Sequence, residues 1–251
     1  KDHIVGMTGD GVNDSPALKQ ANVGIAVSGA TDAARAAASL VLTLPGLGVI
    51  IKAVEEARKI FERMTSYAIY RITETIRIML FIVLTMLAYN IYPITAIMII
   101  LLALMNDLPI MTIAYDNTYL NQKPVRWHMH RILTIATLLG LIGVVETFLL
   151  FVFAKRYATT EELQTLIFLK LVVAGHLTLF VARTKDAFYK KPWPAPLLLS
   201  AILGTQILAV LIAGFGLIVA PIPWIWIAYV WVYCLFWIFI EDRAKILAYR
   251  Y

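Results

Sequence analysis

Six long apolar segments constrain this sequence more than any other feature. Each is close to the roughly 20 residues that a helix needs to cross a bilayer. They lie at about 67–89, 92–113, 132–154, 163–182, 197–219 and 223–240. Only 15% of the 251 residues are charged, against roughly 25% in soluble domains. The sequence therefore predicts a mainly α protein, with a bundle of six transmembrane helices in a lipid bilayer over residues 67–251.

Residues 1–50 are more polar and contain no such segment. Apolar runs that suit short strands alternate there with segments that suit short helices, which is the rhythm of an open parallel sheet. Only the end of such a sheet is present, so we expect a partial α/β domain. From Gly48 a helical pattern continues without glycine or proline as far as Pro93. It predicts a stalk at 51–66 that enters the first transmembrane helix and links the two parts mechanically.

The distribution of basic residues predicts the orientation in the membrane. The net charge is +6, but the basic residues gather in loops between the apolar segments, which argues against a nucleic-acid partner. If residues 1–50 are cytoplasmic, ten lysines and arginines lie on the cytoplasmic side and two on the other side. This asymmetry follows the positive-inside rule and places both ends of the chain in the cytoplasm. The ten are Lys123, Arg126, Arg131, Arg183, Lys185, Lys190, Lys191, Arg243, Lys245 and Arg250, and the two are Lys155 and Arg156.

The string TGDGVNDSPALK at residues 8–19 is the first candidate for chemistry. Asp10 and Asp14 lie four residues apart in a glycine-containing turn that follows a predicted strand. Mg²⁺ prefers oxygen ligands and commonly bridges one or two carboxylates to a phosphate. A turn without chemical importance is the alternative for the short GDG sequence, but the full string is too specific for it.

This string resembles the hinge motif of the P-type ATPases, whose phosphorylation domain belongs to the haloacid-dehalogenase group. The following ANVGIAVSGATDAARAAASLVLT continues the resemblance. It implies that Asp10 is a Mg²⁺ ligand, that Asn13 contacts the phosphoryl group, and that Asp14 helps to order the site and is a second candidate ligand. ATP would be the substrate.

The same resemblance implies that this chain is part of a larger pump. The DKTGT motif with the phosphorylated aspartate, the nucleotide-binding and actuator domains, and the first four membrane helices of the family have no counterpart in these residues. We therefore expect the chain to act with a preceding part of the same polypeptide. By itself it should neither hydrolyse ATP nor form a phosphoenzyme.

A second candidate site lies within the apolar segments. Arg71, Glu74 and Arg77 fall in the first segment, and the second contains Asn106-Asp107-Leu108-Pro109. Ionisable groups at membrane depth are costly, so they are functional candidates by default. Pro109 removes a helix hydrogen bond and is expected to interrupt the helix and free a carbonyl near Met105.

ITETIRI and ALMNDLPIMTIAYDN resemble the corresponding helices of the plasma-membrane proton pumps. The resemblance implies that Asp107, next to Asn106, carries the proton and that Arg77 assists its release. The intact protein would be an H⁺-exporting P-type ATPase of the plasma membrane. A fixed guanidinium near the carrier repels a bound metal cation but suits a carboxylate that gains and loses a proton.

Several alternatives stay open. Glu74 can pair with Arg77 at i, i+3, which would weaken the hold of Arg77 on Asp107. A pump for Ca²⁺ or Na⁺/K⁺ is the alternative within the class. A non-catalytic membrane anchor or a secondary transporter with a hinge-like head is the alternative of another class. Glu146, Lys170 and His176 receive no role from the sequence.

Overall fold

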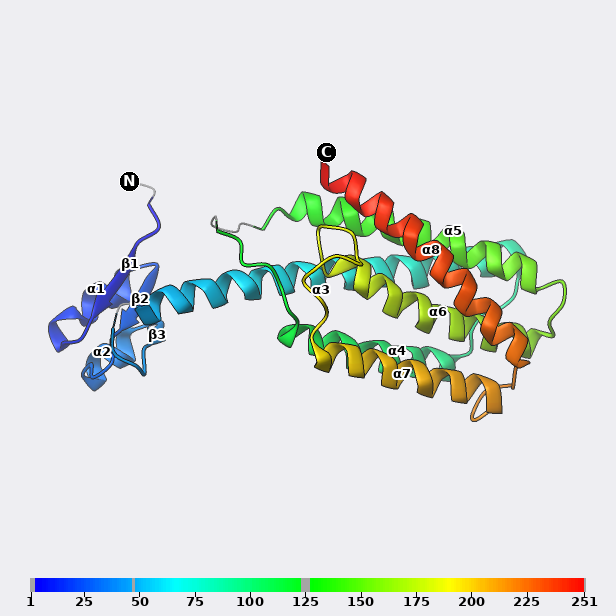
Figure 1. Cartoon of the computed structure of the whole chain (residues 1–251), viewed down its shortest axis with the longest axis horizontal. Helices are drawn as coiled ribbons and strands as arrows, with labels where there is room; N and C mark the ends of the chain where they lie inside the picture. The colour runs from blue at the N-terminus through cyan, green and yellow to red at the C-terminus, as the bar shows by residue number, and fades with distance from the viewer. Residues whose placement is uncertain (1–2, 47, 123–126, 251) are drawn as a thin grey trace. The chain divides into compact units, whose positions relative to one another are not determined.

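The computed structural model describes residues 3–46, 48–122 and 127–250. The chain divides into two compact units, residues 1–58 and 59–251. Each unit is described by itself below, with the labels used in Figure 1.

The first unit contains a three-stranded parallel sheet in the order β1-β2-β3. Leu18, Ala26, Ala30 and Ala34 form its small core. This arrangement confirms the predicted partial α/β segment. Its elements are β1 (Gly6–Gly9), the 3₁₀ turn η1 (Val12–Asp14), α1 (Ser15–Gln20), β2 (Val23–Ala26), α2 (Asp32–Ala37) and β3 (Leu40–Val41).

Among the described residues, six helices are long and apolar enough to cross a membrane, as the sequence predicts. The helix that starts before the first apolar segment is continuous over 42 residues. The six are α3 (Gly48–Tyr89), α4 (Ala96–Thr112) with its 3₁₀ extension η2 (Ile113–Tyr115), α5 (Met129–Ala154), α6 (Thr160–Ala182), α7 (Pro196–Phe215) and α8 (Trp224–Arg250).

Helix α6 is the centre of the second unit. Its most apolar 18-residue window is 89% buried, whereas the same measure is 28–56% for the other five helices. It packs against α4, α5, α7 and α8, and Figure 1 shows it enclosed by these helices. Charged and polar side chains are buried inside this unit, while large apolar ones such as Leu87, Val232 and Phe236 are exposed. Exposed apolar and buried polar groups together suit a protein whose solvent is lipid.

Local chemistry explains where the helix ends differ from the predicted segments. α4 begins at Ala96, after Pro93, because the Thr95 side chain caps it by accepting from the Met98 N–H. α7 ends at Phe215 because Gly216 takes a left-handed conformation with φ of 70°, the usual way to stop a helix. α8 continues ten residues past the predicted end at 240 and carries Glu241, Asp242 and Lys245, all buried.

Candidate functional site

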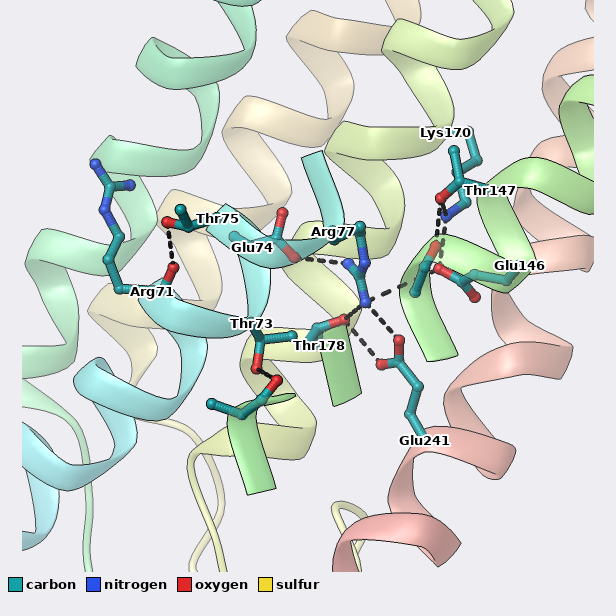
Figure 2. Close-up of polar contacts among 12 residues, drawn as sticks. Arg71, Thr73, Glu74, Thr75, Arg77, Glu146, Thr147, Lys170, Thr178 and Glu241 are labelled. Atoms are coloured by element: carbon teal, nitrogen blue, oxygen red, sulfur yellow. Dashed lines mark hydrogen bonds and ion pairs between the residues drawn. The ribbon is translucent and has the colours of Figure 1, made fainter. Parts of the chain in front are cut away.

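A buried cluster of charged side chains lies inside the helical unit (Figure 2). Four helices contribute to it: α3, α5, α6 and α8. The exposed fraction is 4% or less for each charged side chain in it. The cluster consists of Glu74, Arg77, Glu146, Lys170 and Glu241, together with the hydroxyls of Thr147 and Thr178.

Arg77 is the hub of this cluster. Its Nη1 donates to Glu74 Oε1 at 2.6 Å, which is the i, i+3 pair that the sequence left open. Its Nη2 donates to Glu241 Oε1 at 2.5 Å and to the Thr178 hydroxyl at 2.8 Å. Glu146 Oε1 lies 3.9 Å from the same nitrogen. A guanidinium with five donors in a planar fork suits such a site better than a lysine, since it can serve several acceptors at once.

Lys170 forms the other positive centre of the cluster. Its ammonium donates to Glu146 Oε1 and to the Thr147 hydroxyl, both at 2.5 Å. The Thr178 hydroxyl in turn donates to Glu241 Oε2 at 2.8 Å. Buried charges are tolerated only when they are paired and hydrogen-bonded, and these contacts provide that pairing.

A glycine on α5 makes room for the guanidinium. A Cβ added at Gly143 would lie 2.1 Å from Arg77 Nε, well inside van der Waals contact. The hydrogen bonds to Glu74, Thr178 and Glu241 hold the guanidinium in place, so it has little freedom to move aside.

We expect Gly143→Ala to destabilise the intact protein by about 1–3 kcal/mol, as overpacking a tight site does. The measurement is the loss of folded protein on heating, followed by size-exclusion chromatography in detergent. Gly204→Ala in α7 is the matched control, because a Cβ there meets nothing within 4 Å and alanine favours a helix by up to about 1 kcal/mol. Equal loss in both variants would contradict the proposed steric role of Gly143.

Asp107 does not join the buried cluster. Its Oδ1 accepts from Arg71 Nη1 at 2.7 Å, and both side chains are about half exposed, at 45% and 47%. Arg71 points away from the partners of Arg77 (Figure 2). The expected proximity of Arg77 to Asp107 is therefore wrong: the arginine that contacts Asp107 lies six residues earlier on α3. The Nη atoms of Arg77 donate instead to Glu74, Glu241 and Thr178.

The proline in α4 frees a carbonyl without ending the helix. α4 is continuous through Pro109, so the expected interruption is absent from this described helix. The Met105 carbonyl, four residues before the proline, lies 3.1 Å from His176 Nε2 of α6. His176 therefore replaces the donor that Pro109 lacks, and this gives a structural reason for a histidine inside the bundle.

In the first unit, the TGDGVND string starts in the last two residues of β1 and continues through η1. Asp14 turns back into this loop, where its Oδ2 accepts from the backbone N–H groups of Asp10 at 3.0 Å and Gly11 at 3.1 Å. These bonds hold the pKa of Asp14 below its ordinary value, and the bond from Gly11 has the larger effect. Its charged form stabilises the turn above the ordinary pKa, and this support is lost as the pH falls through the lowered pKa.

The same geometry explains a glycine of the motif and leaves Asp10 exposed. A Cβ on Gly9 would lie 2.6 Å from the Asp14 Cβ, so no larger residue fits against the Asp14 side chain. Asp10 and Asn13 are exposed at the same turn. One accessible carboxylate at the carboxyl end of a parallel strand fits Mg²⁺, which takes one or two carboxylates and completes its shell with water and phosphate. Asp14 serves the backbone, in keeping with an ordering role.

Glu241 has no role in the prediction from sequence, and Lys245, assigned to a loop, lies on α8. Glu241 directly follows the last apolar run, and its i, i+4 spacing to Lys245 is a signal that the helix continues past residue 240. Lys245 is buried and donates to Asp242 Oδ1 at 2.8 Å. Arg183, assigned to a loop, is buried and paired with Asp116 Oδ2 at 2.8 Å.

Comparison with known proteins agrees with this architecture. Residues 91–247 match the family model described as "Cation transporting ATPase, C-terminus". A protein of Methanocaldococcus jannaschii named as a cation-transporting ATPase is 53% identical over 98% of this chain. A protein of Dictyostelium discoideum named as a plasma membrane ATPase is 34% identical over 97% of it, and one of Leishmania donovani named as a proton ATPase is 33% identical over 96%.

The chain spans 31%, 26% and 29% of the length of these three relatives. It therefore corresponds to less than a third of each of them. The family match covers five of the six membrane-capable helices, and the relatives align with the first unit as well. The chain belongs to the P-type cation-transporting ATPases and represents their C-terminal region.

Proposed function

We propose that the intact polypeptide is an ATP-driven pump that exports protons across the plasma membrane through a phosphorylated intermediate. In this proposal residues 1–50 supply the end of the phosphorylation domain, and the six helices supply half or more of the transport domain. Both ends of this chain lie in the cytoplasm. Two relatives with names that specify a plasma membrane or proton ATPase support the proposal.

The observation that carries the choice of the proton is the placement of two arginines among the membrane carboxylates. Arg77 is fully buried at the centre of the cluster and holds a fixed positive charge there. Arg71 contacts Asp107 directly. A desolvated metal cation would be repelled by both guanidinium groups, whereas a carboxylate next to an arginine can still exchange a proton.

Asp107 is the proposed proton carrier. Protonation removes its charge and breaks the ion pair with Arg71, while deprotonation restores the pair. After the proton is released, Arg71 acts as the counter-ion of the charged Asp107. Arg71 thus takes the role in proton release that the sequence assigned to Arg77. Asn106 is buried beside Asp107 on the same helix.

A pump for Ca²⁺ or Na⁺/K⁺ needs several oxygen ligands around one point. In the part of the chain that the structure describes, no group of three or more His, Cys, Asp or Glu side chains is placed to hold a metal ion. A secondary transporter or passive anchor is disfavoured by the hinge loop with its exposed Asp10, and a DKTGT motif upstream of Lys1 in the same gene would exclude both.

Asp10 and Asn13 would hold Mg²⁺ and the phosphoryl group in the intact enzyme. When Mg²⁺ is bound, it would neutralise part of the negative charge of the phosphoryl group. Asp10 provides the charged oxygen ligand, and Asp14 keeps the loop in the conformation that exposes Asp10.

The decisive test of the transported ion is acidification by the intact pump reconstituted into vesicles with Mg²⁺ and ATP. We expect acidification at full rate in the presence and absence of Na⁺, K⁺ or Ca²⁺. A strict requirement for one of these ions would move the protein to the metal-cation pumps. An uncoupler that carries protons should abolish the pH gradient and leave ATP hydrolysis intact.

A further inference from the structure

The buried cluster has one negative charge too many. Glu74, Glu146 and Glu241 supply three carboxylates, and Arg77 and Lys170 supply two cations, which leaves an excess of one negative charge when all are ionised. An uncompensated charge in a low-dielectric interior is costly, and a buried carboxyl in that situation takes up a proton.

The hydrogen bonds show which carboxyl needs the proton. Both oxygens of Glu241 accept a hydrogen bond, one from Arg77 and one from Thr178. Glu146 Oε1 accepts from Lys170 at 2.5 Å. Glu74 Oε1 accepts from Arg77, but Glu74 Oε2 has no partner. Among the described residues, it is the one carboxylate oxygen that is both buried and without a hydrogen-bond partner.

A second unpartnered acceptor lies beside it. Asn106 Oδ1 of α4 is also buried and without a partner. Both oxygens, Glu74 Oε2 and Asn106 Oδ1, lie 3.2 Å from the point where a Cβ of Gly175 would be. Because Gly175 of α6 has no side chain, the position of its missing Cβ is free. Glu74 Oε2 of α3 and Asn106 Oδ1 of α4 both lie next to that position. Asn106 Nδ2 lies 3.3 Å from the same point. A proton on Glu74 Oε2 would supply a donor for the unpartnered Asn106 Oδ1.

We propose that Glu74 and Asn106, facing each other across Gly175, form a buried proton-holding site in which Glu74 carries a proton on Oε2. This site is separate from Asp107, which pairs with Arg71 at the half-exposed face. The presence of the buried proton follows from the cluster alone. Its use as a station for the transported proton rests on the proposed function.

The groups around Glu74 come from every helix that packs near it. On α3 they are Arg77, Arg71 and the buried Tyr70. Asn106 and, beyond it, Asp107 lie on α4, and Glu146 lies on α5. Lys170 and His176 lie on α6, and Glu241 on α8 reaches the same Arg77. Arg77 and Lys170 are shared among Glu74, Glu146 and Glu241, so two cations compensate only two of the three carboxylates.

The test is infrared spectroscopy of the purified intact pump at neutral pH in H₂O and D₂O. We expect the carbonyl stretch of a protonated carboxylic acid, with a shift to lower frequency in D₂O. Glu74→Gln should remove this band, because the amide replaces the neutral acid. Asp107→Asn and the exposed Glu161→Gln should leave it unchanged. A wild-type spectrum without the band, or a band that survives in Glu74→Gln, would overturn the proposal.

If Glu74→Gln does not fold, a second variant tests the same pair of side chains. Asn106→Leu removes the acceptor and keeps the acid, so the band should move to higher frequency as its hydrogen bond is lost. An unshifted band in that variant would exclude the Glu74–Asn106 pair.

A transport measurement distinguishes the presence of the buried proton from its use in pumping. ATP-driven acidification by Glu74→Gln should fall by about a hundredfold, the smaller end of what a positioned proton-transfer group contributes. A lost band with wild-type acidification would overturn the role of Glu74 in transport. If the wild-type pump shows the band but transports a metal ion, the proposed function fails and the buried proton stands.

Discussion

Replacing Asp107 with asparagine is expected to abolish ATP-driven acidification of vesicles by the intact pump. Asparagine keeps the shape and a hydrogen-bond acceptor but cannot take up and release a proton. The variant should fold, because asparagine has nearly the same size as aspartate and its amide oxygen can still accept from Arg71 Nη1. Folding is checked by size-exclusion chromatography and nucleotide binding by displacement of a fluorescent analogue.

Arg71→Gln is the companion to this variant. It leaves the carrier in place and removes its counter-ion, so acidification should continue at a reduced rate with a changed pH optimum. Glu161→Gln, on the exposed first turn of α6, controls for the loss of a carboxylate elsewhere in the membrane unit. Full acidification by the Asp107→Asn pump would remove Asp107 as the carrier.

Replacing Asp10 with asparagine is expected to reduce Mg²⁺-dependent phosphorylation of the intact pump by several orders of magnitude. An amide cannot replace a charged oxygen ligand at a hard cation. Asp10 is exposed, and the Asp14 carboxylate accepts the backbone N–H groups that hold the turn. The folded state of the first unit should therefore be unaffected. The measurement is acid-stable phosphoenzyme formed from labelled ATP.

Two variants in the same unit serve as controls for Asp10→Asn. Asp32→Asn, an exposed aspartate in the first turn of α2, should leave the phosphoenzyme level unchanged. Asp14→Asn should have a smaller effect than Asp10→Asn, since its amide oxygen can still accept from the N–H groups of Asp10 and Gly11. Near-normal phosphoenzyme in Asp10→Asn would make the hinge loop structural rather than catalytic.

The sequence by itself determined the six membrane-capable helices and the short parallel sheet. Both depend on local information: a run of about 20 apolar residues is long enough to cross a bilayer wherever it stands, and the strand and helix signals of residues 1–50 repeat over a few residues each. The pair Glu74–Arg77 was also within reach, because residues three apart on a helix share a face.

Only the tertiary structure decided which charges meet. Glu241 lies 164 residues from Arg77 along the chain, and no local pattern relates the two. The choice between Arg71 and Arg77 as the partner of Asp107 depends on which face of α3 turns toward α4 and which toward α6 and α8. The space between Glu74 and Asn106 likewise exists because a third helix places Gly175 there. Side chains on one helix are ordered by sequence, but contacts among four helices are set by how the helices pack.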